Sequence, residues 1–227
     1  MRSLTFLAAL LIAFAARTTA AQEAPTPTAT TELYVRSFGD PSRPAIVFLH
    51  GGPGYNCASF EITAAPILAR DFRVVVYDQR GCGRSPTGTA DCYTFERSLA
   101  DLSAVITSQG LRRPHFIGHS FGGAIALKFA ETHPDALGTV VLVGAPVSYT
   151  TLDLAPLLHA QKARVRAIYG AEDWTLDADT RALLAGELGE AGFATVEGAS
   201  HSVFVDQPTR FCKLVVEKLA PAPPRKD

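Results

Sequence analysis

The stretch "HFIGHSFGGAIAL", residues 115–127, joins an apolar, strand-like run to an apolar run at helical spacing. Ser120 stands at the junction, between Gly118 and Gly122. The pattern G-x-S-x-G is typical of a nucleophile on a sharp strand-to-helix turn, where a Cβ on either glycine would collide with the neighbouring chain. Glycine and serine are also common turn residues, so the pattern alone leaves an ordinary turn open. Partners elsewhere in the chain must decide between the two.

Strand-like and helix-like segments alternate over most of the chain. Strand-like runs rich in β-branched residues lie at 33–38, 45–50, 72–78, 115–119, 139–144, 165–170 and 193–198. Apolar residues recur at helical spacing over 95–110, 122–134, 177–192 and 201–220, with a break expected at Pro208. This alternation predicts an α/β fold with a mostly parallel central sheet and helices on both faces.

Composition and the chain ends narrow the class of protein further. The chain has 227 residues, a net charge of −1 and 47% hydrophobic residues, which predicts one substantial core and no nucleic-acid surface. Arg2, an apolar run and small residues predict a signal peptide over 1–21, for which a buried N-terminal helix is the alternative. A linker over 22–31, a single domain over 32–220 and a disordered tail over 221–227 follow. We therefore expect a secreted or periplasmic protein without stable membrane insertion after signal cleavage.

Four cysteines, Cys57, Cys82, Cys92 and Cys212, suit an oxidising compartment. They are too scattered for a zinc site, and no C-x-x-C pair occurs. Four cysteines allow three complete pairings, and one disulfide is favoured over two.

Two polar residues follow later strands at the edge where parallel sheets bind ligands. Asp173 follows strand 165–170 in "YGAEDW", and His201 follows strand 193–198 in "EGASHSVF". The order serine, acid, histidine is that of a triad in which the imidazole takes the hydroxyl proton and the carboxylate fixes its tautomer. Chance rarely places all three after successive strands, so Ser120 is predicted to be a nucleophile. Glu172 is the alternative acid.

A glycine-rich turn, "HGGPG" at 50–54, follows strand 45–50. Such a turn aims a backbone N–H at the oxyanion that develops during acyl transfer. We expect the N–H groups of Gly52 and Phe121 to form the oxyanion hole, with Gly51 as the alternative to Gly52. His50 is expected to hydrogen-bond within the loop rather than to move protons.

Together, "HGGPG", "DQRGCGRS" (78–85), "GHSFGG" (118–123), "YGAEDW" and "GASH" (198–201) resemble the α/β-hydrolase superfamily. The first two are most similar to its proline iminopeptidase branch, and the resemblance covers roughly 33–219. It implies the α/β-hydrolase fold, the triad Ser120, Asp173 and His201, and the oxyanion hole at Gly52 and Phe121. It also implies structural roles for Asp78 and Arg80. Cys82 stands in a motif that cytosolic relatives share, which leaves Cys57 and Cys92 as the disulfide candidate.

The sequence departs from the branch where its helical cap belongs. Only 145–163 separates the two strands that flank the cap, and this segment holds one acid, Asp153. The family's tryptophan after the nucleophile is replaced by Phe121. We therefore expect a minimal lid and an open site, whose predicted substrate-binding residues are Tyr55, Val147, Tyr149, Trp174 and Val203. The remaining histidines, His115, His119, His133 and His159, lack ligand-like spacing and are expected at surfaces or turns.

These observations predict a serine hydrolase that cleaves ester or amide bonds of small acyl or peptide substrates through an acyl-enzyme. It needs no metal or organic cofactor, and the oligomeric state stays open. The alternatives are a proline iminopeptidase that releases N-terminal proline, and an inactive hydrolase-like binding protein.

Overall fold

The structure, a computed structural model, describes residues 32–52, 54–149 and 152–220. The predicted signal peptide, linker and tail lie outside these residues. The described chain forms a sheet of seven strands in the order β1-β3-β2-β4-β5-β8-β9. The strands are β1 (Val35–Phe38), β2 (Ala45–Leu49), β3 (Arg73–Tyr77), β4 (His115–His119), β5 (Val140–Val143), β8 (Val165–Gly170) and β9 (Phe193–Val196). Only the β1–β3 pairing in this sheet is antiparallel, which confirms the predicted fold class.

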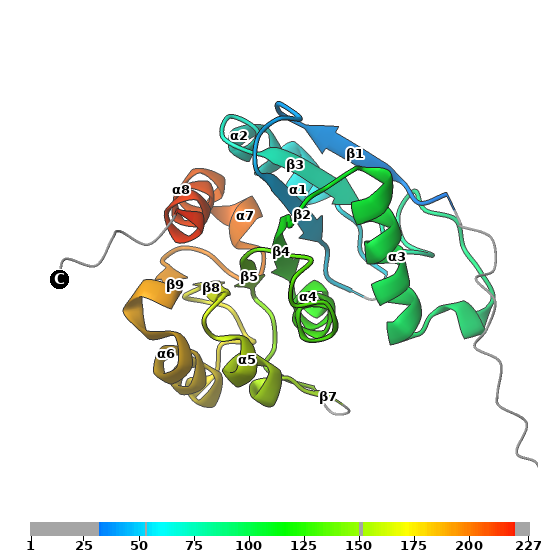
Figure 1. Cartoon of the computed structure of the whole chain (residues 1–227). Helices are drawn as coiled ribbons and strands as arrows, with labels where there is room; N and C mark the ends of the chain where they lie inside the picture. The colour runs from blue at the N-terminus through cyan, green and yellow to red at the C-terminus, as the bar shows by residue number, and fades with distance from the viewer. Residues whose placement is uncertain (1–31, 53, 150–151, 221–227) are drawn as a thin grey trace, which may run out of the picture. The chain divides into compact units, whose positions relative to one another are not determined.

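Helices cover both faces of the sheet (Figure 1). One face carries α1 (Ala58–Ile62), α2 (Ala65–Leu68), α7 (Val203–Asp206) and α8 (Pro208–Leu219). The other carries α3 (Phe95–Ser108), α4 (Phe121–Thr132), α5 (Ala155–Gln161) and α6 (Ala178–Gly192). Because side chains alternate along a strand, Val47 and Leu49 enter the second core while Ile46 and Phe48 enter the first. Burial on both faces explains why the strands are unbroken apolar runs.

The sequence located the long helices better than the short ones. The predicted break at Pro208 is confirmed, since α7 ends at Asp206 and α8 begins at the proline, whose missing N–H is harmless there. Helices α1 and α2 were not predicted, because four or five residues are too few to show a helical period. The same holds for the 3₁₀ turn η1 (Ala90–Cys92).

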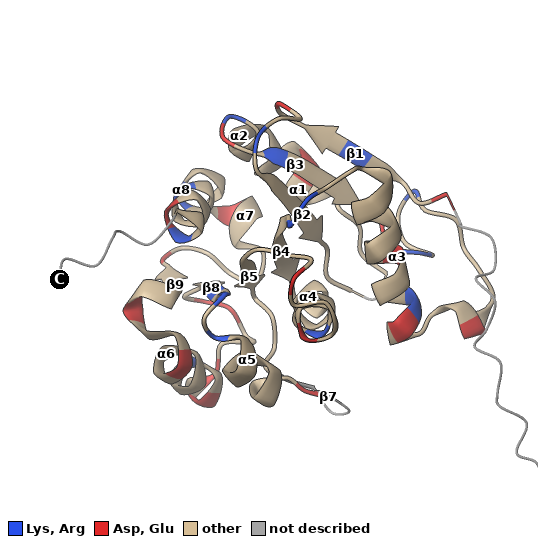
Figure 2. Ribbon diagram, in the orientation of Figure 1, with Lys and Arg blue, Asp and Glu red and all other residues tan. Residues whose placement is uncertain are grey.

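The segment 145–163 forms little secondary structure, as its length predicts. Its described residues contribute the short strands β6 (Ser148–Tyr149) and β7 (Leu152–Asp153), which pair antiparallel, and one helix, α5. Acidic and basic residues are scattered over the helices and loops (Figure 2). Within the described ranges, no helix has the length and apolarity needed to cross a membrane.

Candidate active site

Ser120 lies on a strained turn between β4 and α4. Its backbone has φ 50° and ψ −122°, in the left-handed half of conformational space that non-glycine residues rarely occupy. Its N–H donates to the carbonyl of Val143 at 2.9 Å, and its own carbonyl accepts from the N–H of Gly123 at 2.9 Å. Backbone strain of this kind clusters at functional sites, and here it follows from the predicted strand-to-helix turn.

The glycines around Ser120 let three backbone segments meet. A Cβ on Gly122 would lie 2.2 Å from the carbonyl oxygen of Leu49, at the end of β2. A Cβ on Gly118 would lie 2.7 Å from the Cα of Gly123. Only glycine fits these positions, so α4 starts directly against β4 and the end of β2.

Asp173 and His201 are hydrogen-bonded to each other at the same edge of the sheet. Asp173 follows β8, and its Oδ1 accepts from His201 Nδ1 at 3.0 Å. The N–H and hydroxyl of Thr175 donate to the same oxygen at 2.9 and 2.8 Å. Burial by itself would raise the pKa of Asp173, but the bonds from His201 and Thr175 outweigh it and lower the pKa. An Nδ1–H that donates to this carboxylate leaves the lone pair on Nε2, where a general base needs it.

Gly144, at the end of β5, makes room for this pair. A Cβ there would lie 2.8 Å from Asp173 Oδ2 and 2.9 Å from His201 Nδ1. Asp173 Oδ2 itself is buried and has no hydrogen-bond partner among the described residues. Gly144 was not predicted to belong to the site, although a glycine that directly follows a buried strand was the available signal.

His119 corrects one expectation. It was expected at a surface or turn, but it is buried, with its Nε2 3.1 Å from the carbonyl oxygen of His201. Its ring also lies 4.8 Å from the His201 ring and packs edge-on against Phe204. Burial, with the neighbouring His201 second, lowers the pKa of His119 to about 4. A neutral His119 therefore donates Nε2–H to the backbone of His201; its place at the end of a buried strand, next to Ser120, was the overlooked signal.

Gly51, in the loop that follows β2, lies against Ser120. A Cβ on Gly51 would come within 2.8 Å of the Ser120 Cβ. His50 Nδ1 donates to the carbonyl of Gly51 at 2.7 Å, and its Nε2 accepts from the N–H of Gln79 at 2.9 Å. Burial lowers the pKa of His50, and both ring nitrogens are occupied, as a structural role requires. The assignment of oxyanion donors to the N–H groups of Gly52 and Phe121 stays a prediction.

Asp78 joins Cys57, at the start of α1, to Arg84. Its buried carboxylate accepts from the N–H of Cys57 at 2.8 Å and from the N–H and Nε of Arg84, both at 2.9 Å. Burial opposes its ionisation, but these bonds outweigh it and lower the pKa of Asp78 to about 2. Arg80 pairs with Asp101 through two hydrogen bonds of 2.5 and 2.6 Å. Both residues of "DQRGCGRS" thus tie neighbouring segments together.

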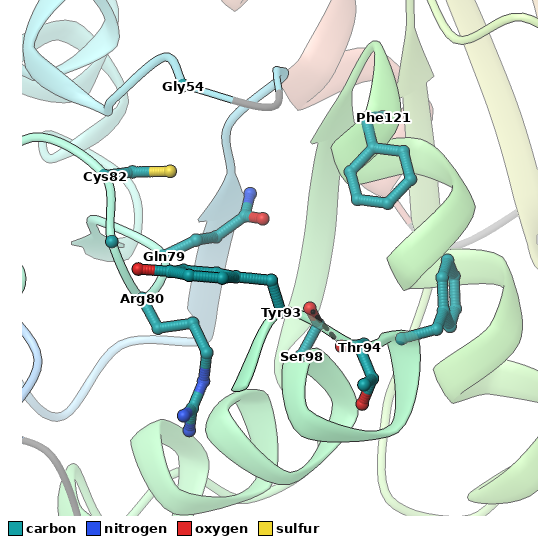
Figure 3. A pocket seen from close by; sticks show the side chains of 10 residues that line it. Gly54, Gln79, Arg80, Cys82, Tyr93, Thr94, Ser98 and Phe121 are labelled. Atoms are coloured by element: carbon teal, nitrogen blue, oxygen red, sulfur yellow. Dashed lines mark hydrogen bonds between the residues drawn. The ribbon is translucent and has the colours of Figure 1, made fainter. Parts of the chain in front are cut away.

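A cavity of about 340 Å³ lies beside the turn at Ser120 (Figure 3). It is lined by Gly54, Gln79, Arg80, Gly81, Cys82, Tyr93, Thr94, Phe95, Ser98 and Phe121. This wall was not predictable from the sequence, because α3 and the loops after β2 and β3 are far apart in the chain.

None of the four predicted substrate-binding residues whose side chains the structure describes lines this cavity. Val147 and Val203 are wrong predictions, since they are buried in the two cores on either side of the sheet. Tyr55 and Trp174 are 71% and 77% exposed, and the Trp174 ring lies 5.3 Å from that of His201. The side chain of Tyr149 lies outside the described residues.

The cysteines are all unpaired in the structure, which contradicts a disulfide between Cys57 and Cys92. Cys57 is buried with its sulfur 3.3 Å from Arg84 Nη2, whereas Cys92 lies in η1 with its sulfur 3.6 Å from the hydroxyl of Thr89. Burial raises the pKa of the Cys57 thiol. In the part of the chain that the structure describes, no group of three or more potential metal ligands gathers.

Comparison with known proteins identifies the family. The model of the alpha/beta hydrolase fold family matches residues 44–157. The chain belongs to this family. Among curated relatives, the proline iminopeptidases of Lactobacillus helveticus and Neisseria gonorrhoeae are 35% and 36% identical over 115 residues, about half of this chain. The matches cover 39% and 36% of those two proteins, so the chain spans well under half of their length.

Solved structures show the same hydrolase fold over most of the chain. A marine microorganism esterase superposes with a TM-score of 0.67 at 23% identity, over 84% of this chain and 100% of the esterase. An enol-lactonase from Burkholderia xenovorans LB400 superposes with a TM-score of 0.67 at 21% identity, over 82% and 96% of the two chains. At these identities the likeness establishes the fold alone.

Proposed function

We propose that this alpha/beta hydrolase cleaves ester or amide bonds of small acyl substrates through an acyl-enzyme on Ser120. The observation that carries the proposal is the strained turn at Ser120 at the same sheet edge as a hydrogen-bonded Asp173–His201 pair. A hydroxyl on such a turn and an imidazole oriented by a buried carboxylate are the parts that nucleophilic acyl transfer requires.

The reaction follows from these parts. Ser120 Oγ attacks the substrate carbonyl carbon while His201 Nε2 takes the hydroxyl proton. The oxyanion accepts hydrogen bonds from the N–H groups of Gly52 and Phe121, the latter at the positive end of α4. Collapse of this intermediate expels the alcohol or amine, which receives the proton from His201. Water, deprotonated by His201, then attacks the acyl-enzyme, and the carboxylic acid leaves as Ser120 regains its proton.

A fluorophosphonate probe tests the proposal directly, since it phosphonylates only an activated serine. We expect one adduct, which peptide mapping places on Ser120, and p-nitrophenyl ester turnover that Ser120→Ala lowers by several orders of magnitude. Ser59→Ala, on the exposed side of α1, serves as the control and should retain turnover. Undiminished turnover by folded Ser120→Ala would contradict the mechanism, and an unlabelled wild type would favour the inactive binding protein.

A second candidate is proline iminopeptidase activity, which the identity to two such enzymes favours. That activity binds a free amino terminus, and a cationic group needs an acidic partner when it is buried. The described cavity wall contains no Asp or Glu. Prolyl p-nitroanilide and p-nitrophenyl butyrate, compared at equal concentration, separate the candidates; faster release from the prolyl amide would support the peptidase.

A further inference from the structure

We propose that the cavity beside Phe121 binds the acyl group of the substrate, and that this group is uncharged and apolar: a medium-length aliphatic chain or a single aromatic ring. The inference rests on the proposed function and assigns one side of the scissile bond to this cavity.

The sheet order separates the cavity from the proton donor. Loops after β2 and β3, together with α3, build the wall, and these strands lie on one side of β4. Asp173 and His201 follow β8 and β9, which lie on the other side. Because His201 must protonate the leaving group, the leaving group has to lie on its side of Ser120. The substituent that reaches the cavity, past Phe121, is therefore the acyl group.

The polar side chains of the wall already have hydrogen-bond partners in the protein. Tyr93 Oη accepts from the N–H of Gly88 at 2.9 Å, and Ser98 Oγ donates to the carbonyl of Thr94 at 3.2 Å. Thr94 Oγ1 caps α3 by accepting from a backbone N–H at 3.2 Å, and Gln79 Nε2 donates to the carbonyl of His50 at 2.6 Å. Carbon surfaces remain for an occupant, including the edge-to-face rings of Phe95 and Phe121.

The wall offers no partner for a charged occupant. Arg80 is the one charged residue that lines the described cavity, and Asp101 neutralises it through two hydrogen bonds. An ammonium or carboxylate that entered would lose its hydration without an opposite charge in return. Each methylene of an apolar chain, by contrast, is expected to raise kcat/KM about fourfold until the cavity is filled.

Ester hydrolysis tests the chain-length dependence. We expect kcat/KM to rise from p-nitrophenyl acetate through butyrate to hexanoate, and the ester of ε-aminohexanoic acid to react more slowly than the hexanoate. Ser98→Phe places a ring in the cavity and should abolish the preference for hexanoate over acetate. Ala100→Phe, on the exposed side of the same helix, is the matched control and should retain the preference.

Cys82 supplies a readout that needs no catalysis, because its thiol points into the cavity (Figure 3). Cys57 and Cys212 are buried, so Cys92→Ser leaves Cys82 as the accessible thiol. In a Ser120→Ala, Cys92→Ser protein, hexanamide should slow the alkylation of Cys82 by iodoacetamide several-fold, whereas acetamide should not.

The outcomes separate the two proposals. Labelled Ser120 with equal rates for the three esters, and no protection of Cys82, would overturn the cavity assignment while the proposed function stands. Protection by hexanamide without any labelling or turnover would leave the cavity's preference for apolar groups intact and refute the proposed function. A faster reaction of the amino ester than of the hexanoate would overturn the inference that the occupant is uncharged.

Discussion

Replacing Gly122 with alanine tests how closely the turn at Ser120 is packed. Gly122 lies in the first turn of α4, where its Cα faces the end of β2. The new Cβ would lie 2.2 Å from the carbonyl oxygen of Leu49 and 2.8 Å from that of His50, well inside the 3.4 Å at which ordinary contact begins. Both obstacles are backbone atoms, so no side chain can rotate to make room.

Two opposing effects set the magnitude. In a helix interior, alanine stabilises the helix by about 1 kcal/mol relative to glycine. Overpacking a close contact costs about 1–3 kcal/mol, and the upper end applies here because β2 must move as a strand. We expect a net loss of about 2 kcal/mol in the free energy of unfolding, which lowers the Tm by about 4–8 °C in a domain of this size. Turnover should fall too, since the displaced backbone leads into the loop 50–54.

Gly186→Ala is the matched control, since Gly186 is also helical but nothing lies within 4 Å of its added Cβ. It should raise stability by about 1 kcal/mol, or the Tm by about 2–4 °C. Thermal and urea unfolding of the two variants and the wild type, followed by circular dichroism, make the comparison. A Gly122→Ala protein as stable as the wild type, beside the expected gain for Gly186→Ala, would refute the packing argument.

Three further predictions address the residues around the site. Asp173→Asn should lower kcat by roughly 10³–10⁴-fold with the fold intact, because an amide cannot stabilise protonated His201; steady-state kinetics and circular dichroism check both parts. The pKa of His119 is about 4 in the folded protein and 6.5 in the unfolded chain. As the pH falls from 6.5 to 4, the unfolded chain therefore binds a proton at His119 that the folded protein does not bind. The free energy of unfolding should therefore drop by up to about 3 kcal/mol between pH 7 and pH 4. Urea titrations should show a smaller drop for His119→Gln than for the wild type. An equal drop in both proteins would exclude His119 as the cause. Asp78→Ala should lower the free energy of unfolding in urea by about 3 kcal/mol, because it leaves a buried ion pair without its carboxylate. Asp71→Ala removes an exposed ion pair with Arg43 at 4.0 Å and should change the free energy of unfolding little. Similar effects of the two substitutions would contradict the structural role of Asp78.

Local sequence signals predicted the strands, the long helices and the turn at Ser120. Each of these depends on interactions within a few residues: side-chain alternation, helical periodicity, or a glycine's freedom from Cβ contacts. The positions of Asp173 and His201 were also predictable, because the carboxyl ends of parallel strands meet at one edge. Chain order was therefore enough to bring their loops together.

What the sequence by itself determined is the chain order of the seven strands of the large sheet and of the long helices, and the residues that stand at the strand ends. Tertiary structure alone decided that Val147 and Val203 pack in the cores, and that Tyr93, Phe95 and Ser98 share a cavity wall with Phe121. The physical reason is that burial and cavity shape depend on which distant segments fill the same space. No local pattern records that, whereas backbone periodicity and turn strain are properties of neighbouring residues.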